Sequence, residues 1–110
     1  MAGSNLYRGT LDLLILQTLK WGKLHGYAIR RWIEERSEGS LKVDEGVLYP
    51  GLRRLENRGW IKGGWGETET GRKARFYTLT KKGSAALQKE TDRWQEHAEG
   101  VFSILRQPGG

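Results

Sequence analysis

Three polar side chains that can read nucleic acid lie on one side of a short predicted helix. At about 100° per residue, Arg53, Arg54 and Asn57 point away from its leucines. Arginine can form paired hydrogen bonds to guanine or contact phosphate, and asparagine can pair with adenine. The alternative is a surface helix whose arginines are simply solvated, and this segment alone does not decide between the two. The leucines that would anchor it are Leu48, Leu52 and Leu55.

Charge and composition narrow the class of protein. The 110 residues contain 19 Lys and Arg against 13 Asp and Glu, for a net charge of +6. A basic balance favours nucleic acid or another anionic partner. This length corresponds to one domain with a modest core.

The residue types also argue against an enzyme or a metalloprotein. The chain has no cysteine, and its two histidines, His25 and His97, are far apart in sequence. Without a thiol, a histidine pair or a serine placed beside a base, we expect no catalytic site, no metal and no cofactor. The apolar run of residues 11–19 is interrupted by Asp12 and is too short to span a bilayer, so a cytoplasmic protein without membrane contact is expected.

Two further helices are predicted to support the basic one. Residues 11–19 are apolar nearly all round, which is typical of a central buried helix, with Thr10 as its cap. A second helix is expected over residues 27–36, with Arg30 and Glu34 on its solvent side. The basic helix itself is expected to begin near Val47 with Pro50 in its first turn.

The start and the end of the basic helix follow from two residues. Asp44 can cap its start, and Gly59 ends it. An extended hairpin should follow, with strands over residues 60–65 and 75–79 and a polar tip over residues 66–74. Its cations Arg72, Lys73 and Arg75 suit phosphate or a narrow minor groove, although a solvated turn stays open as an alternative.

The last predicted helix, residues 81–105 with Thr80 as its cap, carries an apolar seam. Spacings of 4, 3, 4, 3 and 4 residues are typical of a coiled-coil or bundle helix, and they predict a homodimer. The alternative is a helix folded back on its own domain. We expect a frayed tail over residues 107–110. The seam residues are Leu87, Thr91, Trp94, Ala98, Val101 and Leu105.

The order helix, helix, helix, hairpin, helix predicts a mainly α (α+β) fold. Three helices and a two-stranded wing form a winged helix-turn-helix domain over residues 1–80, and a long C-terminal dimerisation helix spans residues 81–106. In this arrangement the third helix enters the major groove of DNA and the hairpin reaches an adjacent groove or phosphate.

Five segments of the chain resemble the PadR family of bacterial transcriptional regulators. They are RGTLDLLIL at residues 8–16, LHGYAI at 24–29, EGVLYPGLRRLE at 45–56, GWI at 59–61 and RKARFYTLT at 72–80. They occur in the family's order and are specific as a set. The single terminal helix resembles the short subfamily. This resemblance implies a homodimeric repressor of operator DNA that an effector releases.

The resemblance also implies roles for individual residues. Tyr49 and Pro50 match the family's LYP element near the DNA backbone, and His25 and Tyr27 match its HGY element, where a structural or phosphate role is expected. Val47 stands where relatives often carry Ser or Thr, so an apolar contact to a thymine methyl would replace a hydroxyl contact.

An aromatic residue on the terminal helix lines a pocket for flat apolar compounds in some relatives. The resemblance therefore makes Trp94 a candidate effector contact, although a Trp at such a position is more often dimer core. Phe102 and Leu6 could share or seal that pocket, and Phe102 could join the dimer interface. A winged helix that binds a protein and a non-specific nucleoid-type DNA binder stay open as alternatives to a specific repressor.

Overall fold

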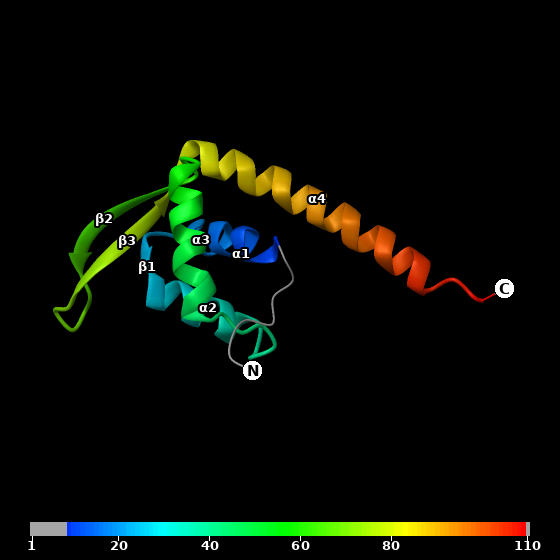
Figure 1. The fold of residues 1–110 in the computed structure, drawn as a ribbon, viewed down its shortest axis with the longest axis horizontal. Coiled ribbons are helices and arrows are strands. Elements are labelled where there is room, and N and C mark those ends of the chain that lie inside the picture. Colours follow the sequence, from blue (N-terminus) through cyan, green and yellow to red (C-terminus); the bar gives the residue numbers. More distant parts are fainter. Residues whose placement is uncertain (1–8, 110) are drawn as a thin grey trace.

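The computed structural model describes residues 9–109. Figure 1 shows a group of helices at the centre, a hairpin projecting from one end and a long helix running away at the other. The elements in chain order are α1 (Thr10–Leu19), β1 (Leu24–His25), α2 (Gly26–Arg36), α3 (Glu45–Asn57), β2 (Ile61–Glu67), β3 (Lys73–Leu79) and α4 (Lys81–Leu105).

A small antiparallel sheet completes this mainly α, α+β fold. Its strand order is β1-β3-β2, so the expected two-stranded wing, β2 and β3, carries a third strand on one side. In β1, Leu24 lies opposite Tyr77 and His25 lies opposite Phe76. The sequence predicted no strand ahead of the helix over residues 27–36. That expectation was wrong, because a two-residue strand is too short to show alternation in the sequence.

The hydrophobic core forms around α1, which contacts the other two core helices, β3 and the start of α4. Ile15 and Leu16 of α1 are completely buried, as are Leu48 and Leu55 of α3. These side chains supply the apolar burial that stabilises a domain of this size. The central position predicted for α1 and the inward leucines predicted for α3 are therefore confirmed.

Side-chain caps mark the starts of α3 and α4. Asp44 accepts a hydrogen bond from the Gly46 N–H at 2.9 Å, and Thr80 accepts one from the Gly83 N–H at 2.9 Å. Both caps were predicted. The cap predicted for α1 was wrong: Thr10 lies inside the helix, and Gly9 precedes it with a left-handed φ of 87° and no side-chain bond.

Pro50 lies deeper in α3 than its residue type suggested. The helix begins at Glu45, so Pro50 is its sixth residue and not part of its first turn. Proline disfavours helical geometry at the preceding residue, and this local rule moved the predicted start to Val47. The Asp44 cap and the buried Leu48 outweigh that rule. Pro50 lacks the N–H that would bond the Gly46 carbonyl.

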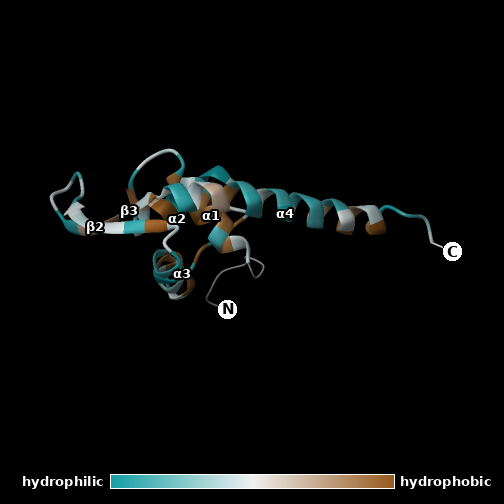
Figure 2. Cartoon of the chain, turned by 90° about the horizontal axis from the view of Figure 1, so that it is seen from above, coloured by the Kyte–Doolittle hydropathy of each residue, from teal (hydrophilic) through white to brown (hydrophobic). Residues whose placement is uncertain are grey.

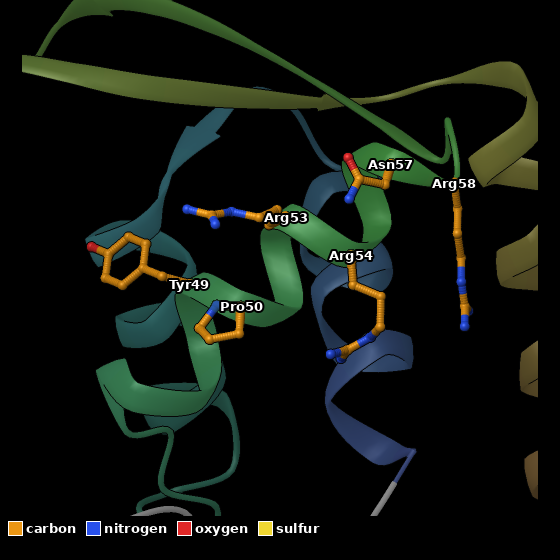
Figure 3. Close-up of a pocket in the computed structure, with 6 residues that line it drawn as sticks. All are labelled: Tyr49, Pro50, Arg53, Arg54, Asn57 and Arg58. Carbon is orange, nitrogen blue, oxygen red and sulfur yellow. The ribbon is translucent and has the colours of Figure 1, made fainter.

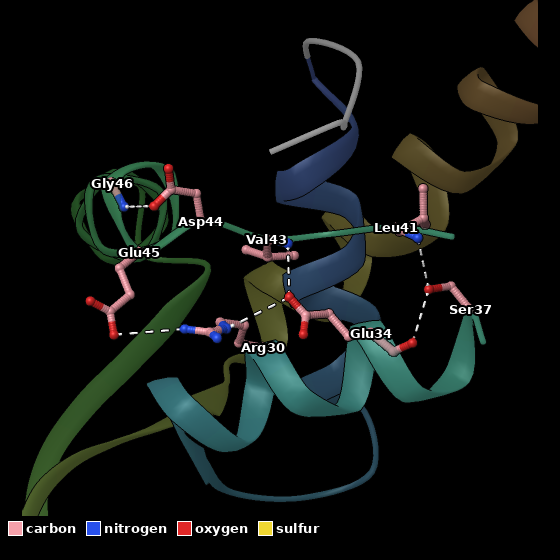
Figure 4. Close-up of polar contacts among 8 residues, drawn as sticks. All are labelled: Arg30, Glu34, Ser37, Leu41, Val43, Asp44, Glu45 and Gly46. Carbon is pink, nitrogen blue, oxygen red and sulfur yellow. Dashed lines mark hydrogen bonds and ion pairs between the residues drawn. The ribbon is translucent and has the colours of Figure 1, made fainter. Parts of the chain in front are cut away.

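Charged side chains fix the connection between α2 and α3 (Figure 4). Glu34 accepts a hydrogen bond from the Val43 N–H at 3.1 Å, and the Arg30 Nε lies 3.6 Å from the same carboxylate. Arg30 also reaches Glu45 at 3.7 Å. We expected Arg30 and Glu34 to be solvated on α2. Instead they are half-buried and tie the start of α3 to α2.

The first turns of α4 pack closely against the rest of the domain. A Cβ at Gly83 would overlap the Trp60 carbonyl oxygen, so only glycine allows this approach. Leu87 is 6% exposed and belongs to the core. Beyond it the helix leaves the domain (Figure 1). Among the described residues, no helix is long and apolar enough to cross a membrane.

Candidate nucleic-acid interface

The outward side of α3 forms a shallow, open hollow of about 600 Å³. Close packing on the opposite side holds the helix in place, because a Cβ at Gly51 would lie 3.3 Å from Leu11 of α1. The structure thus brings together the polar residues predicted for this helix, as Figure 3 shows. The lining residues are Tyr49, Pro50, Arg53, Arg54, Asn57 and Arg58.

The two neighbouring arginines of α3 differ in their surroundings. Arg54 donates hydrogen bonds to Asp12 of α1, one of them from Nε at 3.2 Å, and this interaction raises the pKa of Arg54 above its ordinary value. Arg53 forms no ion pair with any of residues 9–109 and extends toward Tyr49 (Figure 3). Arg53 is therefore fully available to a partner, whereas Arg54 shares its charge with Asp12.

Arg58 is a basic residue of this surface that the sequence analysis missed. Its guanidinium stacks over the Trp60 ring at 5.0 Å and lies 3.9 Å from the Asp12 carboxylate. It follows Arg54 by four residues, which is one turn of a helix and a signal that could have identified it.

The predicted backbone contacts cluster at the starts of α2 and α3. Tyr49 is 47% exposed, and its ring packs on Gly26, where a Cβ would lie 2.9 Å away. Tyr27 and Val47 are also exposed. His25 is less open, because its ring stacks on Phe76 with centroids 5.2 Å apart. Tyr27 and Tyr49 can therefore meet a ligand more freely than His25 can.

The hairpin tip is shorter than predicted. Glu67 still pairs with Lys73 in the sheet, so the turn covers residues 68–72 and not 66–74. Thr68 and Arg72 close it with a backbone hydrogen bond of 2.8 Å. Gly71 takes the left-handed φ of 82° that this turn requires. Arg72 and Lys73 are exposed beside the tip, and Lys73 lies 5.2 Å over the exposed Trp65 ring.

Arg75 differs from the other cations of the wing. Its Nη2 atom lies 2.5 Å from the Glu56 carboxylate of α3, and this hydrogen bond raises the pKa of Arg75. Burial raises the pKa of the neighbouring Tyr77, whose ring is 6.0 Å from the Arg75 guanidinium. The sequence grouped Arg75 with Arg72 and Lys73 as a cation that faces DNA. In the structure its guanidinium instead points to Glu56 of the same chain.

A second uncovered surface lies on the distal half of α4. Trp94, Val101, Phe102 and Leu105 are 41%, 44%, 51% and 70% exposed. Figure 2 shows brown, apolar positions returning near the C-terminal end of this helix, far from the domain. Ile104, 68% exposed, was absent from the predicted seam.

The remaining predicted seam residues have different surroundings. Leu87 is already buried in its own domain, whereas Thr91 is exposed and donates its hydroxyl hydrogen to the Leu87 carbonyl at 2.7 Å. Ala98 is partly buried, and the Trp94 ring lies 5.8 Å from His97. Leu6 lies outside the described residues. Within that described part of the chain, no three His, Cys, Asp or Glu residues gather as metal ligands do.

These features define the class of protein. Three packed helices with a polar outward face on the third, followed by a basic hairpin, form a winged helix-turn-helix, the fold of many DNA-binding regulators. Residues 15–89 match the model of the transcriptional regulator PadR-like family. The chain belongs to this family of DNA-binding transcriptional regulators.

Solved structures agree with this assignment. A transcriptional regulator from Clostridium thermocellum superimposes with a TM-score of 0.79 at 30% identity, covering 91% of this chain and 93% of that one. A PadR family transcriptional regulator from Eggerthella lenta gives 0.78 at 27% identity, covering 92% and 86%. An uncharacterised protein from Lysinibacillus sphaericus is 32% identical over 99 residues, 90% of this chain and 91% of its own length.

Proposed function

We propose that this regulator is a homodimeric repressor that binds an inverted-repeat operator in the cytoplasm. The observation that carries the proposal is the outward face of α3, where Arg53 and Asn57 make no side-chain hydrogen bond or ion pair with residues 9–109. Buried leucines hold the opposite face of the same helix. A rigid helix with free polar side chains is the element that enters a major groove.

Within this proposal, base reading and phosphate binding divide among the residues of the surface. Arg53 and Asn57 read base edges, and Val47 contacts a thymine methyl. Arg54 contacts the DNA from the position in which its ion pair with Asp12 holds it. The groups proposed to contact the phosphate backbone are His25, Tyr27, Tyr49, Pro50, Arg72 and Lys73.

The distal half of α4 supports the proposed dimer. A row of exposed large apolar side chains on a monomer indicates an interaction surface. A second copy of the same helix would cover it along the seam that includes Thr91 and Ala98. Two-fold symmetry of the protein then requires two operator half-sites in inverted orientation.

Release of the operator by a small aromatic or apolar effector belongs to the same proposal. Trp94 and Phe102 lie on the surface that the partner would cover, and aromatic side chains favour flat apolar ligands. Leu6 is a third proposed contact. An effector that binds there can change the distance between the two α3 helices of the dimer without touching DNA.

Fluorescence anisotropy tests the proposal with a duplex that carries the inverted repeat found beside the gene and a scrambled duplex of equal composition. We expect binding of the repeat at least 10³-fold tighter than binding of the scrambled duplex, as for specific DNA-binding proteins. Arg53→Ala should abolish this preference while the dimer persists.

Each other outcome assigns the protein differently. Equal affinity for both duplexes would indicate a nucleoid-type binder, and no binding to either would indicate a protein-interaction module. Arg93→Ala is the matched control, because it removes the same charge from α4, where Arg93 pairs only with Glu90 at 3.2 Å among the described residues. It should leave the preference intact.

A further inference from the structure

Among the described residues, one ion pair joins the hairpin to α3. Arg75 of β3 donates a hydrogen bond to Glu56 of α3 at 2.5 Å, and the two side chains are 35% and 30% exposed. Glu56 directly precedes Asn57, one of the proposed base-reading residues. The pair therefore connects the wing to the part of α3 that would read DNA.

Residues of the hairpin surround the Arg75 guanidinium. Its carbon centre lies 5.8 Å from the Trp65 ring and 6.0 Å from the Tyr77 ring, within the range of cation–π attraction. Gly63 of β2, which pairs with Tyr77 in the sheet, lies under the Arg75 side chain, and a Cβ at Gly63 would lie 2.6 Å from the Arg75 Nε atom. A Cβ at position 63 would push the guanidinium aside, so Gly63 leaves the space in which the Arg75 side chain reaches Glu56, Trp65 and Tyr77.

We propose that Arg75 is a positioning residue, which holds the wing at a fixed orientation to α3 through Glu56 and does not itself bind DNA. The inference rests on the proposed function. Arg72 and Lys73 can meet phosphates while α3 occupies the major groove only if the wing keeps its angle. Fixing the hairpin before binding removes part of the ordering cost that DNA binding would otherwise include.

The variant Glu56→Gln separates this role from a direct contact, because the two predict opposite signs. If Arg75 bound phosphate, removing a nearby carboxylate would free the guanidinium and lower the repulsion of DNA, so binding would tighten. If Arg75 positions the wing, Glu56→Gln weakens binding by roughly 2–5-fold, the factor expected for a part-exposed ion pair. Gly63→Ala should weaken binding similarly without any change of charge.

Two controls isolate the effect. Glu69→Gln removes the same charge at the exposed hairpin tip, where Glu69 forms no ion pair within residues 9–109, and it should leave binding equal or slightly tighter. In a chain that already carries Arg72→Ala and Lys73→Ala, Glu56→Gln should cause no further loss, because the wing no longer contributes. A role in general stability would persist in that background.

Hydrogen exchange of the free protein provides a reading that does not depend on DNA. The amides of residues 61–67 and 73–79 should exchange faster in Glu56→Gln and Gly63→Ala than in the parent, while those of α2 do not change. Tighter DNA binding by Glu56→Gln, or unchanged hairpin exchange, would overturn the inference. If the parent protein showed no preference for its operator, the proposed function would be overturned instead. The effects of Glu56→Gln and Gly63→Ala on affinity could still be measured with random DNA.

Discussion

Two uncovered surfaces within residues 9–109 differ in chemistry. The outward face of α3 and the wing are polar and basic, whereas the distal half of α4 exposes Trp94, Val101, Phe102 and other large apolar side chains. Exposed arginines are stable in water, but a contiguous apolar row is not. The difference indicates two kinds of partner: a polyanion for the first surface and a second copy of the chain for the other.

The largest effect is expected from a charge placed within the apolar surface of α4. Val101→Asp should make the protein monomeric at micromolar concentration, because a carboxylate buried in the interface has no partner. Affinity for the complete operator should then fall by about 10²–10⁴-fold, the gain usually provided by linking two binding units. Sedimentation measures the first effect and anisotropy the second.

The control for that variant places the same charge on the polar side of α4. Ser103→Asp should leave both the dimer and the operator affinity unchanged, since the residues one turn away are Glu99, Gly100, Arg106 and Gln107 and none of them belongs to the apolar seam. A Val101→Asp protein that stays dimeric would contradict the assignment of the apolar surface.

Two glycines of α4 test whether its two halves differ as the structure indicates. Gly83→Ala should lower the free energy of unfolding by about 2–3 kcal/mol, because the new methyl group meets the backbone of Trp60. Gly100→Ala, with nothing within 4 Å, should raise it by roughly 0.5–1 kcal/mol through helix propensity. Denaturant titration measures the free energy of unfolding of both variants. Equal changes would contradict the close packing of the first turns of α4 against the domain.

On the basic surface, Asn57→Ala should reduce specific binding by about 1–3 kcal/mol and relax the preference at one base pair of each half-site. Asparagine pairs with adenine through two hydrogen bonds, and alanine provides neither. Binding to a panel of operators with single substitutions reveals the relaxed position. A uniform loss at every position would mean that Asn57 contacts phosphate.

The smallest effect is expected at the wing tip. Arg72→Ala should weaken binding to all DNA sequences alike and lower the slope of log affinity against log salt by about one per wing. Titrations at several salt concentrations measure that slope. Lys89→Ala, which removes one positive charge from α4, is the control, and an identical slope in both variants would exclude Arg72 from the contact.

The sequence alone was sufficient for the order of the four helices and the hairpin, and for the leucines that anchor α3. The bounds of α4 followed from the Thr80 cap and an apolar seam, both of which are local signals. Other features depend on tertiary contacts. Arg54 meets Asp12 across 42 residues, and Arg75 meets Glu56 across 19. No spacing rule for helices or strands connects such pairs, so both arginines looked free.

The errors in predicted bounds have a similar origin. The start of α3 was misplaced because the rule for residues before proline is local, while the Asp44 cap and the burial of Leu48 decided the outcome. β1 was missed because its two residues form a strand only by pairing with β3. Arg58 differs from these cases, because its helical spacing from Arg54 was visible in the sequence.

The most direct test of the central claim is to locate α3 on DNA. The chain has no cysteine, so Glu45→Cys at the exposed start of α3 accepts a single iron–EDTA group that cleaves nearby DNA. We predict two cleavage clusters in the major groove, symmetric about the operator centre and about one helical turn apart or a multiple of it. Gln107→Cys at the far end of the chain should give none. Cleavage spread evenly along the duplex, or equal cleavage from both positions, would contradict the account.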